Sequence, residues 1–292
     1  MKPLILLSCL FFASFGAALA FAQDSRPTEA PTAAAAAFDH RPLNALLVRH
    51  VKDERVDYAG LERDRALLDR YIERLEAVTP KAMKTWSEDE RFAFWANTYN
   101  AVTLQLIVDH YRQGEGKTIA SITDIGFEGK DGERLNAWQQ PLVALGAFHP
   151  DGTGEDLTLD AIENRILRPT FGDARVHAAV NCASIGCPPL RAEAFTGKDL
   201  DAQLDDQMQA FLAGPRNAFD EAAKTVGLSK IFEWYGVDFV DAEAGTDLAD
   251  WLVKNGPVGA GATERERAWI RTAELGFLEY DWALNDVVRE KP

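Results

Sequence analysis

Residues 87–107 read SEDERFAFWANTYNAVTLQLI, and this stretch decides the fold. Ser87, followed by Glu90 three positions later, is a capping box, which predicts that a helix begins here. The apolar side chains that follow leave almost no polar face. Because a helix that is apolar nearly all round is usually central and buried, we predict that this helix forms the middle of the core.

Other segments predict shorter elements around it. Apolar residues recur at helical spacing in residues 39–51, 62–78, 200–212 and 247–253. Residues 175–181 and 277–284 alternate in the manner of strands. Since helices dominate, strands are scattered and no internal repeat is present, we predict an α+β fold: a single helix-rich domain with a small sheet, over residues 38–292.

Residues 1–20 predict export. Lys2 gives a positive start, a short apolar run follows, and Ala18-Leu19-Ala20 is a small-x-small cleavage site. The run is too short to span a bilayer, which takes about 20 apolar residues. Residues 21–37 are rich in Ser, Pro, Thr and Ala and read as a flexible tether. We predict a periplasmic or secreted mature chain without a transmembrane segment, and no lipidation at Cys9.

The charge balance limits the classes of partner that the chain is expected to bind. The chain has 31 basic and 46 acidic residues, for a net charge of −15. That disfavours nucleic acid and anionic lipid, which both bind basic patches. Phosphate-binding, dinucleotide, zinc-protease and calcium-loop motifs are absent from the sequence. We predict no cofactor, no bound metal and no nucleic-acid partner, and we expect a small-molecule or peptide ligand.

The segment with the most candidate catalytic residues is 175–189, RVHAAVNCASIGCPP. His, Cys and Ser are the residue types of nucleophilic catalysis, and an Asn can orient a His. In a continuous strand His177 and Cys182 would lie about 16 Å apart on opposite faces, whereas a nucleophile and its base need about 3 Å. Cys187, beyond the turn, folds back beside His177 more easily. The pattern therefore favours Cys187 over Cys182 as a nucleophile, with His177 as its base.

A different interpretation makes the two cysteines structural. In an oxidising compartment, Cys182 and Cys187 are candidates for a disulfide that pins a turn, because a four-residue spacer can bring two Cα atoms within about 6 Å. The five histidines all precede both cysteines. This order differs from that of papain-like enzymes and of α/β-hydrolases. The alternative to a thiol enzyme is thus a non-catalytic envelope module that binds a ligand or partner.

Further polar residues are candidates for the same site. Glu163, three positions after Asp160, either returns a hydrogen bond to the start of a short helix ended by Pro169, or assists catalysis. Asn97 and Asn100 lie one turn apart on the central helix, and buried amides must be hydrogen-bonded. They either tie a loop's backbone to the core or, with Asn181 and Ser184, hold a polar ligand.

Several stretches together resemble the family called domain of unknown function 547. They are residues 56–58, 94–101, 121–125, 159–164, 168–169, 175–191 and 280–285. The resemblance implies a fold and motif positions but no reaction, because the family's activity is unsettled. The positions are Asn97, Asn100, Glu163, His177, Cys182 and Cys187. Members often carry a His directly after the Glu, where this chain has Asn164, so a role for that His is not implied here.

The specific hypothesis from the sequence is a Cys/His-dependent hydrolase or acyl transferase that acts on peptide or cell-envelope material. The binding module with a Cys182–Cys187 disulfide is the alternative.

Overall fold

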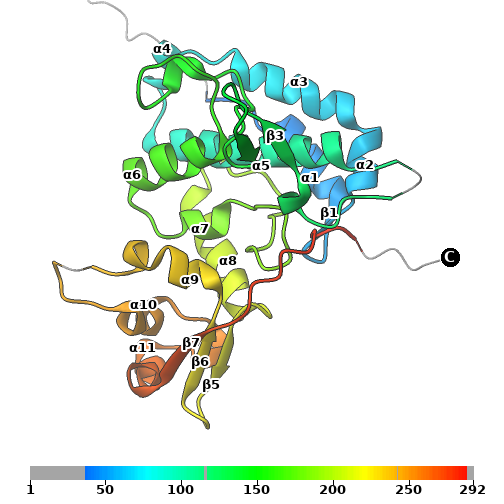
Figure 1. The fold of residues 1–292 in the computed structure, drawn as a ribbon. Helices are drawn as coiled ribbons and strands as arrows, with labels where there is room; N and C mark the ends of the chain where they lie inside the picture. Colours follow the sequence, from blue (N-terminus) through cyan, green and yellow to red (C-terminus); the bar gives the residue numbers. More distant parts are fainter. Residues whose placement is uncertain (1–36, 115–116, 242, 288–292) are drawn as a thin grey trace, which may run out of the picture. The chain divides into compact units, whose positions relative to one another are not determined.

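The computed structural model describes residues 37–114, 117–241 and 243–287 (Figure 1). They belong to one unit, which spans residues 35–292. The predicted signal peptide, Cys9 and nearly all of the predicted tether lie outside the described residues, so export stays a prediction. Within the described part of the chain, no helix combines the length and apolarity that a bilayer crossing requires.

The central helix is confirmed as α5, Glu88–His110. Its capping box is formed, because the Ser87 N–H donates to the Glu90 carboxylate at 2.7 Å and the Glu90 N–H donates to the Ser87 hydroxyl at 3.1 Å. Side chains are buried on every side of the helix from Phe92 to Val108, with Gln105 half-buried. The surrounding elements explain this burial: α2 (Tyr58–Arg63), α3 (Arg65–Glu76), the π-helix η3 (Ala161–Leu167) and α8 (Leu200–Ala213) all pack against α5.

Short elements complete this part of the unit. They are α1 (Arg41–His50), β1 (Val51–Lys52), β2 (Arg55–Val56), α4 (Pro80–Met83), η1 (Ile122–Asp124), β3 (Gly126–Glu128), β4 (Arg134–Asn136), η2 (Gly146–Phe148), α6 (Arg168–Phe171) and α7 (Val176–Ala179). The strands of this part pair as the hairpins β1–β2 and β3–β4. This part is therefore held together by helix packing around α5.

A second hydrophobic cluster includes the last turns of α8 and the elements that follow it in the sequence. A three-stranded sheet has the order β5 (Ala218–Asp220), β6 (Thr225–Leu228), β7 (Glu274–Phe277); β5 is antiparallel to β6 and β7 is parallel to it. The helices α9 (Lys230–Trp234), η4 (Gly236–Phe239), α10 (Leu248–Asn255), η5 (Val258–Ala260), α11 (Glu264–Arg267) and η6 (Ala268–Thr272) accompany it. The α+β class is confirmed, with three small sheets in the described residues where one was predicted.

Three local predictions are wrong. Residues 175–181 contain the one-turn helix α7 instead of a strand, and the Val180 N–H donates to the Val176 carbonyl at 3.2 Å. The strand predicted at 277–284 ends with β7 at Phe277. Pro169 does not end its helix, because it lies in the first turn of α6, where its missing N–H is not needed. The residue that ends the helix is Gly172, whose φ is 59°.

The amides of α5 tie distant backbone to the core. Asn97 donates to the Phe195 carbonyl at 2.8 Å and accepts from the Phe195 N–H at 3.0 Å. Asn100 donates to the Ala179 carbonyl and accepts from the Asn181 N–H, both at 2.9 Å. Each amide therefore satisfies one buried donor and one buried acceptor of a loop.

We expect Asn97→Leu and Asn100→Leu to destabilise the fold. Each change leaves a backbone N–H and a backbone carbonyl unpaired, at a cost on the order of 1–3 kcal/mol per group. Urea unfolding curves measure the loss. Gln105→Leu on the same helix is the control and should cost less, since its half-buried amide bonds, among the described residues, only to the side chain of Asp69. Curves for Asn97→Leu and Asn100→Leu that coincide with wild type would contradict the expectation.

Candidate active site

A cavity of about 300 Å³ collects the residues that the sequence singled out for chemistry. Glu163 lines it from η3, His177 from α7, and Cys182 and Cys187 from the loop that follows α7. The rest of the wall is mainly aromatic and includes Tyr99, Trp138, Trp234, Tyr235, Tyr280 and Trp282. A largely apolar cavity with a few convergent titratable groups is the usual form of a ligand site.

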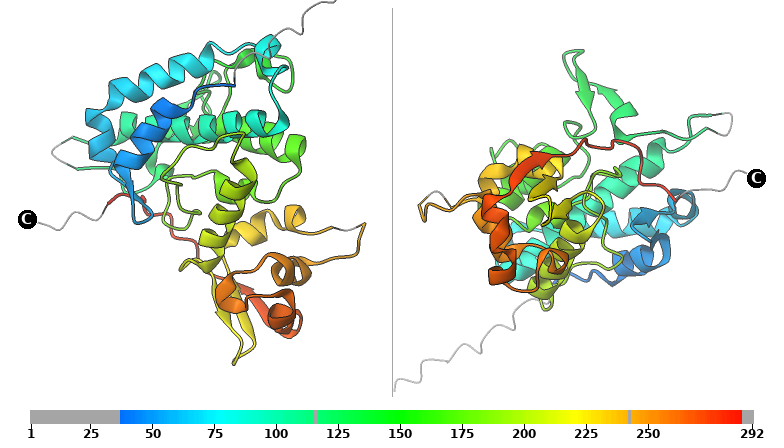
Figure 2. Two further views of the ribbon diagram at one scale, coloured as in Figure 1. Left: turned by 180° about the vertical axis from the view of Figure 1, so that it is seen from behind. Right: turned by 90° about the horizontal axis from the view of Figure 1, so that it is seen from below.

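The C-terminal segment places Tyr280 and Trp282 at this cavity. In Figure 2 it runs from β7 back towards β1. It follows the cysteine loop on the way, because the Gly186 N–H donates to the Asp281 carbonyl and the Ile185 N–H to the Ala283 carbonyl, both at 2.8 Å. It is then fixed at β2, where the Val56 N–H donates to the Asn285 carbonyl at 2.9 Å. Segments about 100 residues apart in sequence therefore build one wall.

The cysteine loop makes a sharp turn at Ala183. Ala183 has a φ of 60°, which is uncommon for a residue other than glycine. The side chain of Asn181 supports the turn, because it accepts from the Ala183 N–H at 2.9 Å and donates to the Pro188 carbonyl at 2.7 Å. Strained backbone of this kind is concentrated at functional sites. Its position next to Cys182 therefore suggests a functional role for the turn.

The two cysteines are free thiols held close together. The Cys182 N–H donates to the Cys187 sulfur at 3.0 Å, and the Cys182 sulfur lies 3.1 Å from the Tyr280 hydroxyl. A hydrogen bond from the Cys187 thiol lowers the pKa of Cys182 and outweighs burial, with further help from Tyr280. Burial raises the pKa of Cys187 well above its usual value. The predicted disulfide is not formed in this structure.

These environments reverse the preference between the cysteines. Cys187 is 3 % exposed, whereas Cys182 is half-buried. The thiolate is the attacking form, so a lowered pKa together with access from the cavity favours Cys182. The preference for Cys187 rested on an extended strand after His177, and the chain instead forms α7 and then turns.

His177 is engaged with a partner that the sequence did not suggest. Its Nε2 lies 2.7 Å from Asp238, which also accepts two hydrogen bonds from Arg168, at 2.6 and 3.0 Å. Burial alone would raise the pKa of Asp238, but the hydrogen bonds from Arg168 and His177 outweigh it and lower that pKa. Asp238 is thus an ionised acceptor and Nε2 is the protonated nitrogen. Burial lowers the pKa of His177 to about 4, so the ring is neutral at pH 7.

The predicted contact between thiol and imidazole is not formed. Within the described residues, the side chain of His177 hydrogen-bonds to Asp238 and to neither cysteine. Its ring stacks on Tyr235, with 4.2 Å between the ring centroids. His177 therefore supports the wall of the cavity through Tyr235.

Glu163 is a buried acid and not a helix cap. Burial raises its pKa against the opposing hydrogen bonds from the hydroxyls of Tyr235 and Tyr99. The helix start is capped instead by Thr158, whose hydroxyl accepts from the Ala161 N–H at 2.9 Å. A carboxyl with a raised pKa and a thiol with a lowered pKa thus line the same cavity.

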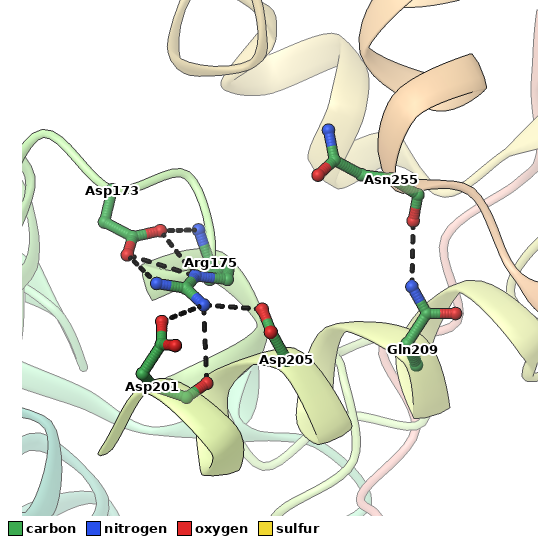
Figure 3. A network of polar contacts seen from close by, with 6 residues as sticks. All are labelled: Asp173, Arg175, Asp201, Asp205, Gln209 and Asn255. Atoms are coloured by element: carbon green, nitrogen blue, oxygen red, sulfur yellow. Dashed lines mark hydrogen bonds and ion pairs between the residues drawn. The ribbon is translucent and has the colours of Figure 1, made fainter. Parts of the chain in front are cut away.

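A polar network fixes α7 on α8. Figure 3 shows Arg175, which directly precedes α7, bonded to Asp173, Asp201 and Asp205. The bonds of Arg175 to the two aspartates of α8 measure 2.8 and 2.5 Å. The same figure shows Gln209 of α8 donating to the Asn255 carbonyl at 2.9 Å. The bonds of Arg175 hold the start of α7, and with it His177 two residues later, against α8.

The four residues predicted to hold a ligand do not line the cavity. Asn97, Asn100 and Asn181 bond to backbone as described above, and the hydroxyl of Ser184, which is 1 % exposed, lies 3.4 Å from the Cys182 carbonyl. The described residues that line the cavity do not include these four. In the same described part of the chain, no group of three or more His, Cys, Asp or Glu is arranged to hold a metal ion.

The comparison with known families adds one finding. Residues 83–212 match the family described as Protein of unknown function, DUF547. The match supports the family that the sequence motifs resemble. It runs from α4 to α8 and contains Glu163, His177 and both cysteines, whereas Asp238 and Tyr280 lie outside the matched DUF547 segment. No curated protein and no solved structure matches the chain.

Proposed function

We propose that the chain is a thiol-dependent hydrolase or acyl transferase, with Cys182 as nucleophile and Glu163 as proton donor. One observation carries the proposal: the cavity brings together a half-buried thiol of lowered pKa and a buried carboxyl of raised pKa. Two titratable groups whose environments push their pKa values apart are typical of an acid–base or nucleophile–acid pair.

The reaction follows from these two groups. The Cys182 thiolate attacks the acyl carbon, and the bond to the leaving group breaks while the Glu163 carboxyl gives its proton to that group. Water, or another acceptor, then attacks the thioester and returns one proton to Glu163. The carbon–sulfur bond breaks and sulfur leaves as the thiolate. For water the products are the free acid and the protonated leaving group, and both enzyme groups regain their starting forms.

Neighbouring residues support these roles. The Tyr280 hydroxyl and the Cys187 thiol stabilise the Cys182 thiolate by hydrogen bonds. Neutral His177, anchored by Asp238, positions Tyr235, whose hydroxyl bonds to Glu163. We propose peptide or cell-envelope material as the substrate, in keeping with the predicted export.

Alkylation at neutral pH tests the assignment of Cys182. Iodoacetamide without reductant should label the mature protein, which lacks residues 1–20 and therefore Cys9, at Cys182 alone, because Cys187 is buried and its pKa is raised. Peptide mapping by mass spectrometry identifies the site. Tyr280→Phe removes one hydrogen bond to the thiolate and should move the pH midpoint of labelling upwards.

Cys182→Ala is the control and should leave the folded protein unlabelled. First labelling at Cys187 would refute the choice of nucleophile. An unlabelled wild-type protein lighter by two hydrogen atoms would show a disulfide and favour the non-catalytic module.

A further inference from the structure

The edge of the cavity presents large aromatic rings to solvent. Trp234 is 47 % exposed and Trp282 is 38 % exposed. The Trp282 ring centroid lies 4.5 Å from that of Tyr280 and 5.9 Å from those of Trp234 and Trp138. At these separations the Trp282 ring contacts the other three, and the four rings form an aromatic wall. Trp234 and Trp282 both line the cavity and are partly exposed to solvent, so part of each indole is accessible to a ligand.

Among the described residues, the cavity lining has acidic side chains but no Lys or Arg, and Arg168 lies behind the lining, 4.8 Å from the centre of the Tyr235 ring. The acidic side chains are those of Asp160 and Glu163. Within the described residues neither carboxyl forms a salt bridge; Asp160 accepts only from the Asn164 amide, at 2.9 Å. Arg168, the base nearest to Glu163, is already paired with Asp238 at 2.6 Å. Glu163 is uncharged as the proposed proton donor, so Asp160 is the carboxylate of the lining that lacks a cationic partner within the described residues.

We propose that the aromatic wall and Asp160 bind an alkylammonium group, and that the substrate of the thiol chemistry carries such a group. The negative face of an indole ring attracts a cation, and tryptophan is the strongest of the aromatic residues in this respect. An anionic ligand would meet the carboxyls without a base to pair with. A neutral sugar ring would also stack on the indoles, but it would leave Asp160 without a counter-ion.

The proposed cation site depends on the proposed function in one respect only, the statement that its ligand is a substrate of the thiol chemistry. The ammonium group would lie against the exposed indoles. The acyl part would then extend inwards along the lining towards Cys182. A cavity of about 300 Å³ holds a small ligand of this kind.

Titration with choline and with its neutral isostere 3,3-dimethylbutan-1-ol tests the proposal by calorimetry. We expect saturable choline binding in the millimolar range, and at least about 10-fold weaker binding of the alcohol. Trp282→Ala and Asp160→Asn should each weaken choline binding about 3- to 30-fold. Trp282→Phe keeps a ring and should lose less. Asp131→Asn, an exposed carboxylate in the turn between β3 and β4, is the matched control and should bind like wild type.

Equal binding of choline and the alcohol, or no saturable choline binding, would overturn the proposal. Binding of N-acetylglucosamine without choline would overturn it too, in favour of a sugar site. Cys182→Ala separates the two proposals, because it should lack alkylation yet bind choline like wild type. If the wild-type protein binds choline but its Cys182 is not alkylated, the cation site is supported and only the proposed thiol enzyme is contradicted.

Discussion

Replacing Cys182 by Ala is expected to lower the turnover of an acyl substrate about 1,000-fold or more. The thioester cannot form without the sulfur, and removal of a catalytic nucleophile leaves only the contribution of binding and polar stabilisation. Release of p-nitrophenolate from p-nitrophenyl acetate measures the loss. With wild type, a burst equal to the enzyme concentration would show that the acyl-enzyme accumulates.

Cys187→Ala is the matched control for the loss of a thiol. It removes the hydrogen bond that lowers the pKa of Cys182, but it keeps the nucleophile. Activity should therefore persist and shift towards higher pH. The sign follows from the thiolate: activity rises as pH passes the Cys182 pKa, so a higher pKa displaces that limb upwards. Equal activity of Cys182→Ala and wild type would contradict the proposed mechanism.

Local signals explain what the sequence predicted correctly. The capping box at Ser87 and the apolar run after it are short-range features, and they located α5. The same holds for α8, predicted at residues 200–212 and observed at Leu200–Ala213. Residues 175–189 were identified as the chemical segment because His177, Cys182 and Cys187 are reactive residue types, and all three line the cavity.

The partners of those residues could not be predicted in the same way. Asp238 lies 61 residues after His177, and Tyr280 lies 98 residues after Cys182. No periodicity or spacing connects groups so distant. Tyr280 at least belongs to a motif of the family resemblance, residues 280–285, and this was the available signal. Asp238 has no such signal, because it lies within the short helix η4, outside the motifs of the family resemblance.

The choice between the cysteines failed for a different reason. Alternation of apolar residues suggested a strand through His177, and strand geometry then separated it from Cys182. The observed α7 is a single turn of helix, so few local backbone hydrogen bonds mark it in the sequence. The contacts of Arg175 with α8 that hold it in place are tertiary, and the local sequence does not reveal them. Tertiary contacts thus decided the local structure, and with it which of the two sulfurs is the more exposed.

Acidification is expected to unfold the protein through two buried imidazoles. His40 is 7 % exposed and His177 is 2 % exposed, and burial lowers the pKa of each to about 4. In the unfolded chain both have a pKa of about 6.5. Between these values the unfolded state binds more protons, so this stability is complete above about pH 6.5 and is lost as pH falls towards 4. Each group contributes roughly 3 kcal/mol.

Urea unfolding between pH 7 and pH 4.5 measures this dependence. His177→Gln keeps a hydrogen-bond donor for Asp238, and His40→Gln keeps a polar partner for the Tyr71 hydroxyl, which lies 2.7 Å from the imidazole. Each variant should flatten the fall in unfolding free energy by up to about 1.4 kcal/mol per pH unit, the value for one proton. Above pH 8 the slopes of variant and wild type should coincide. Burial raises the pKa of Glu163, so this group changes the unfolding free energy with pH in the opposite direction. Glu163 is present in wild type and in both variants, so its contribution cancels in the comparison. Unchanged acid slopes in both variants would mean that the two imidazoles become charged without unfolding.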